Sequence, residues 1–441
     1  MNTQSTNGRL SGLPGFSFIW AGQILSVLSS GATTFALTIW AYGTYGSATA
    51  LGVITTSFTV PLLLLSPIAG VLVDRHNRKV MMMLSDLAAV SATIGLLILH
   101  ASGGLELWHL FVAAAIMGLG NSFQWPAYSA AITTMVSKEH YHRANGMMSL
   151  VESGPAVFAP LLAGALYPLL GLTGILLLDI ATFLIAMAAL AVVRIPQPPR
   201  SAEGREAQGG AFREALFGFR FIFRRKELLQ LLGFFLALNL IIGLSYPVFA
   251  AMILERTGDN SAALGFTQSA AAIGGVVGGV LISLWGGFKR RMHSIFFGEA
   301  MTGLIALAVF GLGRSLPFWI VAAGIGAVFG PLTNGASQAI WQAKVPADLQ
   351  GRVFSARRLM AWAVGPVTPV LAGALADYVT EPAMMSDTWL ARSFGWLVGT
   401  SPGSGMALQF VMSGILYVAL VVVVYLFVPS LRNLEDLLPD T

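Results

Sequence analysis

The chain is 441 residues long, with 56% hydrophobic residues, 10% charged residues and a formal net charge of +5. Soluble domains carry roughly 25% charged residues, so this composition excludes an ordinary soluble globular protein and indicates a polytopic membrane protein. The sequence contains no cysteine, which excludes disulfides and thiolate-based metal or redox chemistry.

Twelve apolar segments follow one another along the chain. Each is long enough to cross a hydrocarbon core of roughly 30 Å, for which about 20 helical residues suffice. The polar start at 1–13 has no basic n-region, so we expect the first span to stay in the membrane and not to be removed as a signal peptide. The expected spans are 15–41, 48–73, 80–99, 107–136, 144–169, 172–193, 228–253, 262–286, 293–312, 316–343, 359–379 and 407–428.

Basic residues fall almost wholly on one side of these spans. Twelve spans place both termini on the same side, and 22 of the 25 Lys and Arg residues lie there, whereas Arg256, Arg314 and Arg392 lie on the other side. Cytoplasmic loops carry the excess of Lys and Arg in membrane proteins. We therefore expect both termini in the cytoplasm, and the bias supports the number of spans.

The chain repeats itself with an offset of 209 residues. The segment Pro160-Leu-Leu-Ala-Gly-Ala-Leu166 returns as Pro369-Val-Leu-Ala-Gly-Ala-Leu375. Because this offset is far longer than the period of a solenoid, we predict an all-α membrane protein with twelve transmembrane helices in two six-helix pseudo-symmetric halves, 1–193 and 228–441, with any substrate site between them. The same offset relates Gly70 to Gly279, Val136 to Val345, and Arg143 to Arg352.

A linker at 194–227 joins the two halves. Its first part, 194–210, is rich in Pro, Gly and charge, which is typical of a cytoplasmic connection. Phe212, Leu216, Phe219 and Phe223 then recur at helical spacing with arginines between them, which predicts an amphipathic helix on the inner membrane surface. A cytoplasmic extension of the seventh span fits equally well. Positive-inside topology explains the basic residues, so we expect no nucleic-acid partner.

The loop between the second and third spans carries a family signature. Gly70-Val-Leu-Val-Asp74-Arg75-His76-Asn77-Arg78-Lys79 resembles the G-x-x-x-D-R-x-G-R-K motif of the major facilitator superfamily. Asn77 replaces the usual glycine, and this departure from the motif is mild because Asn is the residue that best tolerates the left-handed backbone after Gly. The resemblance implies a cytoplasmic gate formed by Gly70, Asp74, Arg75, Arg78 and Lys79.

Further segments are similar to macrolide-efflux and enterobactin-exporter-type permeases of that superfamily. They are Asn121-Ser-Phe-Gln-Trp-Pro126, Val136-Ser-Lys-Glu-His140, Arg143-Ala-Asn-Gly146, Gly399-Thr-Ser-Pro-Gly-Ser-Gly405 and Leu431-Arg-Asn-Leu-Glu435. This resemblance implies an inner-membrane exporter driven by protons. The chain departs from the drug-antiporter pattern in two places: span 107–136 has no arginine, and the motif of the fifth span is reduced to Gly154-Pro155.

Four carboxylates lie well inside the expected spans, where an ionised acid has to be protonated, hydrogen-bonded or open to a wet cavity. Glu152, close to the helix-loosening Pro155, is the first candidate for proton coupling, and Asp179 is the second. For each, a structural carboxyl bonded to a neighbouring helix is the competing interpretation. Asp86 and Glu299 occupy roughly matching places in the third and ninth spans and are expected to be scaffold polar groups, whereas Asp377 at the outer end of the eleventh span is expected to be solvated.

The resemblance assigns the substrate cavity mainly to the first, fourth, seventh and tenth spans. A mostly apolar cavity with a few amides and aromatic rings suits a bulky amphipathic ligand, although helix-to-helix bonding explains any one of these residues as well. The expected cavity residues are Gln23, Ser26, Thr34, Asn121, Gln124, Trp125, Asn239, Tyr246, Asn334 and Gln338.

The sequence therefore predicts a secondary active transporter that exports a hydrophobic or amphipathic small molecule by alternating access, as a proton antiporter. An importer of the same fold and a non-transporting membrane receptor remain alternatives. No Walker-type phosphate loop, paired-His metal motif or catalytic constellation occurs, so we expect no cofactor, no metal and no enzymatic activity. The expected partners are the substrate, protons and the lipid bilayer, and the protein is expected to be a monomer.

Overall fold

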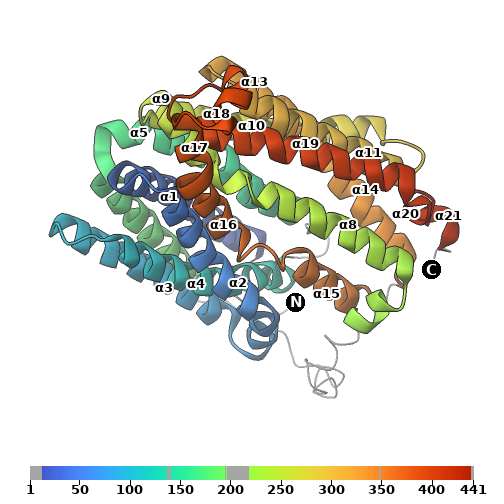
Figure 1. Cartoon of the computed structure of the whole chain (residues 1–441). Helices are drawn as coiled ribbons and strands as arrows, with labels where there is room; N and C mark the ends of the chain where they lie inside the picture. Colours follow the sequence, from blue (N-terminus) through green and yellow to red (C-terminus); the bar gives the residue numbers. More distant parts are fainter. Residues whose placement is uncertain (1–11, 137–140, 194, 196–217, 347–348, 439–441) are drawn as a thin grey trace. The chain divides into compact units, whose positions relative to one another are not determined.

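The computed structural model of the chain describes residues 12–136, 141–193, 195, 218–346 and 349–438. These residues form helices and turns, with no strand among them (Figure 1), which confirms the predicted all-α class. Nine helical segments of the described chain are long and apolar enough to cross a membrane. One of them, Ser153–Val192, is 40 residues long and contains most of two expected spans, so this number is a lower bound on the crossings.

The chain forms two compact units. The first comprises Met1–Trp40 and Ser57–Ser201, and the second comprises Ala41–Thr56 and Ala202–Thr441. The predicted halves at 1–193 and 228–441 stay a prediction. The linker residues Phe212 and Leu216 lie outside the described residues, and 218–223 is helical, with the Arg225 guanidinium 3.7 Å from the centre of the Phe221 ring.

Five long helices supply the first unit, apart from the end of α1 and the start of α2, which lie in the segment Ala41–Thr56 of the second unit. Within α5, Gly171 has φ +61° and ψ −173°, a backbone conformation that favours glycine and interrupts the helix between the two expected spans 144–169 and 172–193. The helices are α1 (Gly12–Tyr45), α2 (Ala48–Arg75), α3 (Arg78–Ala101), α4 (Leu107–Met135) and α5 (Tyr141–Val192).

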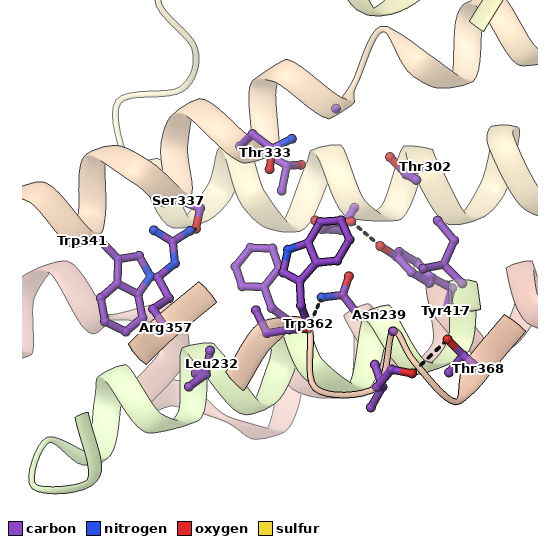
Figure 2. Close-up of a pocket in the computed structure, with 18 residues that line it drawn as sticks. Leu232, Asn239, Thr302, Thr333, Ser337, Trp341, Arg357, Trp362, Thr368 and Tyr417 are labelled. Atoms are coloured by element: carbon purple, nitrogen blue, oxygen red, sulfur yellow. Dashed lines mark hydrogen bonds between the residues drawn. The ribbon is translucent and has the colours of Figure 1, made fainter. Parts of the chain in front are cut away.

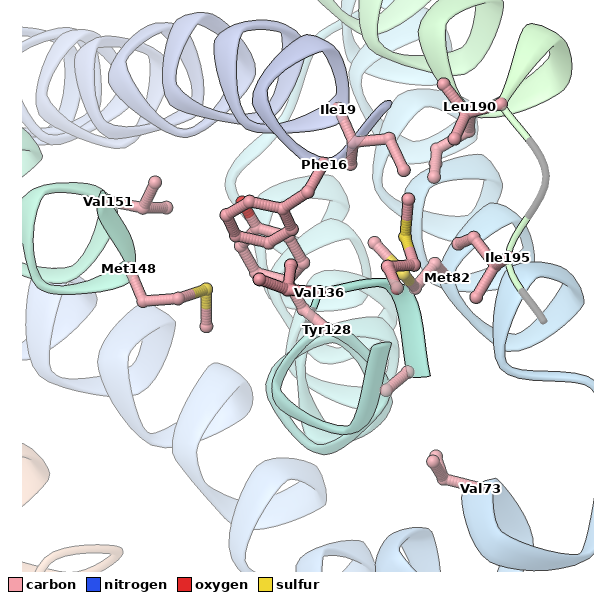
Figure 3. Packing of buried hydrophobic residues seen from close by; sticks show 13 residues of the cluster. Phe16, Ile19, Val73, Met82, Tyr128, Val136, Met148, Val151, Leu190 and Ile195 are labelled. Carbon is pink, nitrogen blue, oxygen red and sulfur yellow. The ribbon is translucent and has the colours of Figure 1, made fainter. Parts of the chain in front are cut away.

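A cluster of buried apolar side chains holds the first unit together. Phe16 of α1 stacks on Tyr128 of α4 with ring centres 6.1 Å apart, and Met82 of α3 and Leu190 of α5 are fully buried beside them (Figure 3). Because lipid tails are as apolar as these side chains, close packing is what favours the helix contacts here.

The second unit contains the remaining helices and several interrupted ones. Two segments, η3 and η4, are π-helical, and such bulges are frequent at functional sites. The elements are α8 (Lys226–Gly243), η2 (Tyr246–Val248), α9 (Phe249–Thr257), α10 (Ser261–Trp285), α11 (Arg291–Met301), η3 (Thr302–Val309), α12 (Phe310–Leu312), α13 (Leu316–Ala327), α14 (Gly330–Lys344), α15 (Gln350–Ala361), α16 (Thr368–Leu375), η4 (Ala376–Thr380), α17 (Glu381–Met385), α18 (Trp389–Val398), α19 (Ser404–Phe427), α20 (Pro429–Arg432) and α21 (Leu434–Leu437).

The eleventh span differs from its expected boundaries. The sequence places it at 359–379, but α15 already begins at Gln350, and a turn at 362–367 separates it from α16. Pro366 and Pro369 explain the interruption, because proline donates no backbone hydrogen bond and disfavours helical geometry in the residue before it. The side chains of α15 therefore belong to the helical part of the second unit.

Arg256 and Glu381 bond to backbone groups at the end of the second unit that the basic-residue count predicts to face the outside. The Arg256 guanidinium donates to the backbone oxygens of Gly313 at 2.6 Å, Val398 at 2.6 Å and Gly403 at 3.2 Å. Glu381 accepts from the backbone N–H groups of Gly403 at 3.2 Å and Met406 at 2.8 Å, and so caps the first turn of α19. Burial of the Glu381 carboxyl, which lies beyond the expected span 359–379, raises its pKa.

Candidate functional site

The second unit contains a partly open cavity of about 450 Å³, which is within the size range of small-molecule sites. It lies among α8, α11, α14, α15, α16 and α19, with the α15–α16 turn along one side (Figure 2). Apolar and aromatic side chains make up much of the wall: Leu232, Phe235, Ile242, Trp341, Trp362 and Val364.

The interrupted helix supplies part of the cavity wall. Trp362 follows the last residue of α15 and lies over the cavity in Figure 2, next to Asn239 of α8. The Asn239 side chain donates to the Ala361 carbonyl at 3.1 Å, and the Thr368 hydroxyl donates to the Val364 carbonyl at 3.1 Å. The Asn239 bond satisfies a carbonyl that the missing helical turn leaves open, whereas the Val364 carbonyl also accepts from the Val367 and Thr368 N–H groups, both at 3.0 Å.

Two charged side chains line the cavity. Glu299 of α11 is 7% exposed, and its carboxyl accepts a hydrogen bond from the Tyr417 hydroxyl of α19. Arg357 of α15 lies near Trp341, with its guanidinium carbon 5.0 Å from the ring centre. Figure 2 shows Arg357 on the Trp341 side of the cavity and Tyr417 on the opposite side.

Arg357 also bonds to α14. Its Nη1 donates to Gln338 Oε1 at 3.1 Å and its Nη2 donates to Ser337 Oγ at 3.0 Å. Sequence reasoning missed this residue, because it counted Arg357 among the basic residues of a cytoplasmic loop. The proline-rich stretch after α15, typical of a broken helix, was the available signal that this segment lines a site.

Three of the expected cavity residues of the second half lie at or beside this cavity. Asn239 and Asn334 line it, and Gln338 contacts it indirectly through Arg357. Tyr246 lies in η2, where its ring stacks on Phe249 with centres 5.8 Å apart, and it is not a lining residue.

The expected cavity residues of the first half have other surroundings within the first unit. Gln23 and Gln124 are bonded to each other at 2.9 Å and to the Asp86 carboxyl at 3.1 and 2.9 Å. Ser26 is buried, whereas Thr34 and Asn121 are exposed. The Trp125 side chain lies outside the described residues.

Of the two expected proton-coupling residues, the structure describes the side-chain contacts of Asp179. Asp179 is 1% exposed and accepts hydrogen bonds from the Ser30 and Thr93 hydroxyls, each at 3.0 Å, so neighbouring helices satisfy its carboxyl. The side chain of Glu152 lies outside the described residues.

The loop between α2 and α3 does not need a left-handed residue at the position where Asn77 replaces the glycine of the motif. Asn77 has φ −67° and ψ 115°, an extended backbone that any residue adopts. Its side chain accepts from the N–H groups of Lys79 at 3.0 Å and Val80 at 3.4 Å, because a residue directly before a helix satisfies unpaired N–H groups.

Of the expected gate residues, Lys79 has the clearest contacts. Its ammonium donates to the carbonyls of Ala191 and Val193, both at 2.8 Å, at the C-terminal end of α5. A cation is favourable there because helix C-termini present unpaired carbonyls. The side chains of Gly70, Asp74 and Arg75 lie outside the described residues, and Arg78 has interactions within the described chain.

Comparisons with known proteins agree with the fold and the motifs. Residues 19–369 match the sequence model of the Major Facilitator Superfamily. Macrolide efflux protein A of Streptococcus pyogenes is 27% identical over 369 residues, covering 82% of this chain and 90% of the relative. Enterobactin exporter EntS of Shigella flexneri is 25% identical over 408 residues, covering 90% and 93%.

A multidrug efflux pump, Tap of Mycolicibacterium fortuitum, is 26% identical over 364 residues and covers 80% of this chain and 86% of the relative. Among solved structures, an inward-facing bacterial homologue of the human lysosomal transporter Spinster has a TM-score of 0.71 at 17% identity, over 96% of this chain and 99% of that one. At that identity the likeness shows the fold alone. The predicted resemblance to this superfamily and to its macrolide-efflux and enterobactin-exporter branch is confirmed.

Proposed function

This chain belongs to the Major Facilitator Superfamily, and we propose that it exports a hydrophobic or amphipathic small molecule in exchange for protons. The fold is the two-half, twelve-helix arrangement of that superfamily, and the protein is a multi-pass membrane transporter. Export is supported by the relatives, which are named as macrolide, multidrug and enterobactin efflux proteins.

The observation that carries the proposal is the cavity of the second unit. Its wall combines two tryptophans and further apolar side chains with a few amides and hydroxyls, which suits a bulky amphipathic ligand. A macrolide, another hydrophobic drug or a siderophore-like compound has this chemistry, and the relatives point to the same classes.

Proton coupling is the second part of the proposal. The predicted coupling residues are Glu152 and Asp179, in the helix that spans Tyr141–Val192. Proton binding has to favour one conformational state over another, or no coupling results. The halves would alternate around the substrate as rigid bodies, in the cell's inner membrane, with both termini in the cytoplasm as the basic-residue bias predicts.

The test is transport by the purified protein in liposomes with a defined pH gradient. Protein inserted with its cytoplasmic side outward should accumulate a labelled macrolide or a fluorescent lipophilic dye when the lumen is acidic, and a protonophore should abolish the accumulation. Under the same conditions, substrate movement from the lumen to the outside, which is the import direction in this orientation, would support an importer. Ligand binding without any movement across the membrane would support a receptor. Flux that is independent of the gradient would overturn the proton coupling.

A deletion strain narrows the substrate class. If the protein is a drug exporter, the strain should become more sensitive to particular hydrophobic toxicants. If it exports a metabolite such as a siderophore, the compound should be retained in the cells.

A further inference from the structure

The two units carry buried carboxyls on corresponding helices, but in different surroundings. Asp86 lies on α3, in the first unit, and Glu299 lies on α11, in the second. The repeat relates Asp86 to Ile295, and Glu299 lies one helical turn further along α11, on the same face of the helix.

In the first unit two amides close around the carboxyl. Gln23 donates to one oxygen of Asp86 at 3.1 Å and Gln124 donates to the other at 2.9 Å, and the Asp86 side chain is 4% exposed. Both carboxyl oxygens therefore have a donor, and none of the three residues lines the cavity described above.

In the second unit neither of the corresponding positions carries an amide. The residue 209 positions after Gln23 is Leu232, and the one after Gln124 is Thr333. Both line the cavity, and the Thr333 hydroxyl is buried without a hydrogen-bond partner among the described residues. Leucine cannot donate a hydrogen bond and threonine is shorter than glutamine, so the space that the amides fill in the first unit is open here.

Glu299 consequently borders open space. Among the described residues its carboxyl has one hydrogen-bond partner, the Tyr417 hydroxyl. Four lone-pair sites are available on an ionised carboxyl, so water or ligand donors in the cavity have positions left to occupy.

The charged and titratable groups around Glu299 come from few elements. Tyr417 of α19 and Arg357 of α15 line the cavity with it, and the lining residues of α8, η3, α14 and α16 carry no titratable group. Lys344 of α14 donates to the Glu435 backbone oxygen of α21 at 3.0 Å, and the Glu435 carboxyl accepts from the Met292 N–H at 3.1 Å, so these two groups bond elsewhere.

We propose that Glu299 is the group that takes up and releases the proton in each transport cycle. This proposal rests on the proton coupling of the proposed function and, in place of the sequence-predicted Glu152 and Asp179, assigns that coupling to a residue that the sequence analysis placed in the scaffold. An O–H bond forms between a Glu299 carboxylate oxygen and a proton delivered by water from the outer side. The same bond breaks when the proton passes to water on the cytoplasmic side, which regenerates the carboxylate.

The two forms of Glu299 offer a ligand different cavities. The ionised carboxylate carries a charge and only accepts hydrogen bonds, whereas the neutral acid carries no charge and has one O–H to donate. A ligand in the same cavity therefore binds the two forms with different affinity, and this difference is what links proton movement to substrate movement.

The experiment compares two transport modes in liposomes with the same labelled substrate. One is uptake driven by a pH gradient, and the other is exchange of labelled for unlabelled substrate without any gradient, which needs binding and conformational change but no net proton movement. We expect Glu299→Gln to lower gradient-driven uptake about tenfold or more and to lower exchange at saturating substrate much less, because the change removes the titratable group and leaves the rest of the cavity wall in place. Glu299→Asp, which keeps a carboxyl, should restore driven uptake in part.

The matched control is Asp86→Asn, the same carboxyl-to-amide change on the corresponding helix of the first unit. It should keep both modes when rates are normalised to correctly folded, reconstituted protein. Driven uptake by Glu299→Gln at the wild-type level overturns the inference, and so does loss of exchange in a variant that elutes as the wild type does in size-exclusion chromatography. A wild-type protein that exchanges substrate but shows no response to the gradient contradicts the proposed proton coupling instead, so the two failures can be distinguished.

Discussion

The attachment of the segment Ala41–Thr56 to the rest of the second unit gives the sharpest prediction about conformational change. Asp377 of η4 accepts from the N–H groups of Ala48 at 3.0 Å and Thr49 at 2.8 Å, and from the Ser47 hydroxyl at 2.8 Å. The first two donors belong to the first turn of α2, so a carboxylate more than 300 residues away caps that helix. The expectation that Asp377 is simply solvated is wrong.

Asp377→Ala removes all three bonds. Hydrogen bonds to a charged group contribute about 1.5–3 kcal/mol each when buried, and loss of a helix cap costs about 0.5–2 kcal/mol. Asp377 is half-buried, so water replaces part of what is lost. We therefore expect the free energy that holds the segment in place to fall by about 1.5–3 kcal/mol, which corresponds to a roughly 10- to 150-fold larger detached population.

The absence of native cysteine makes this population measurable with one introduced thiol. Ala50 lies in the segment and is 4% exposed, so a maleimide should reach Ala50→Cys mainly when the segment detaches. When closing is faster than labelling, the labelling rate follows the detached population, and Asp377→Ala should accelerate it about tenfold or more.

Asp387→Ala is the control, because it removes another carboxyl whose ion pair with Arg392, at 2.7 Å, lies on the surface. Labelling should not change in that variant. Equal labelling rates in Asp377→Ala and in the parent protein would refute the assignment of Asp377 as the attachment point.

Backbone packing predicts the same result independently. A methyl group on Gly52 would lie 2.2 Å from the Pro369 carbonyl oxygen, whereas one on Gly43 would meet nothing within 4 Å. Gly52→Ala should therefore accelerate labelling and Gly43→Ala should not.

Three further predictions concern stability and can be measured by thermal unfolding of the purified protein in detergent. Gln124→Leu removes a donor from the Asp86 carboxyl and should lower the free energy of unfolding by about 1–3 kcal/mol, whereas Asn121→Leu, an exposed amide on the same helix, should be close to neutral. Arg256→Ala removes the guanidinium bonds to the Gly313, Val398 and Gly403 carbonyls and should destabilise the protein by about 2–4 kcal/mol; a melting temperature equal to wild type would contradict the role given to that guanidinium. Because burial raises the pKa of Glu381, stability should fall as the pH rises from about 4.3, the ordinary value, toward the raised native one, and Glu381→Gln should flatten this slope.

Much of the fold could be predicted from the sequence because hydrophobicity and chain breaks are local signals. The short gap between the expected spans 144–169 and 172–193 coincides with Gly171, whose positive φ interrupts α5. The start of the eleventh span could not be found in this way. Arg357 reads as a loop residue by its charge, and only its contacts with Ser337, Gln338 and the Trp341 ring explain why it lies on a helix beside a cavity.

The site itself was harder to predict, because it depends on contacts between distant residues. Gln23 and Gln124 have the composition of ligand-binding amides, but they bond to Asp86. Nothing in the local sequence distinguishes such an amide from one that faces a ligand, since both are polar residues in an apolar helix. Likewise, the pairing of Glu299 with Tyr417, 118 residues later, has no signature in either segment.

The internal repeat nevertheless contains information that composition alone does not. The two copies agree at Pro160–Leu166 and Pro369–Leu375, and such shared residues indicate the framework that both halves need in order to fold. If the cavity of the second unit binds the ligand, the copies have to differ there, because two equally closed carboxyl clusters would leave no space for a ligand. Leu232 and Thr333 are such differences: each replaces a glutamine that fills the first unit, and each lines the cavity in the second. In a protein with an internal repeat, positions where the two copies differ at a buried polar cluster therefore indicate a ligand site better than positions where the copies agree.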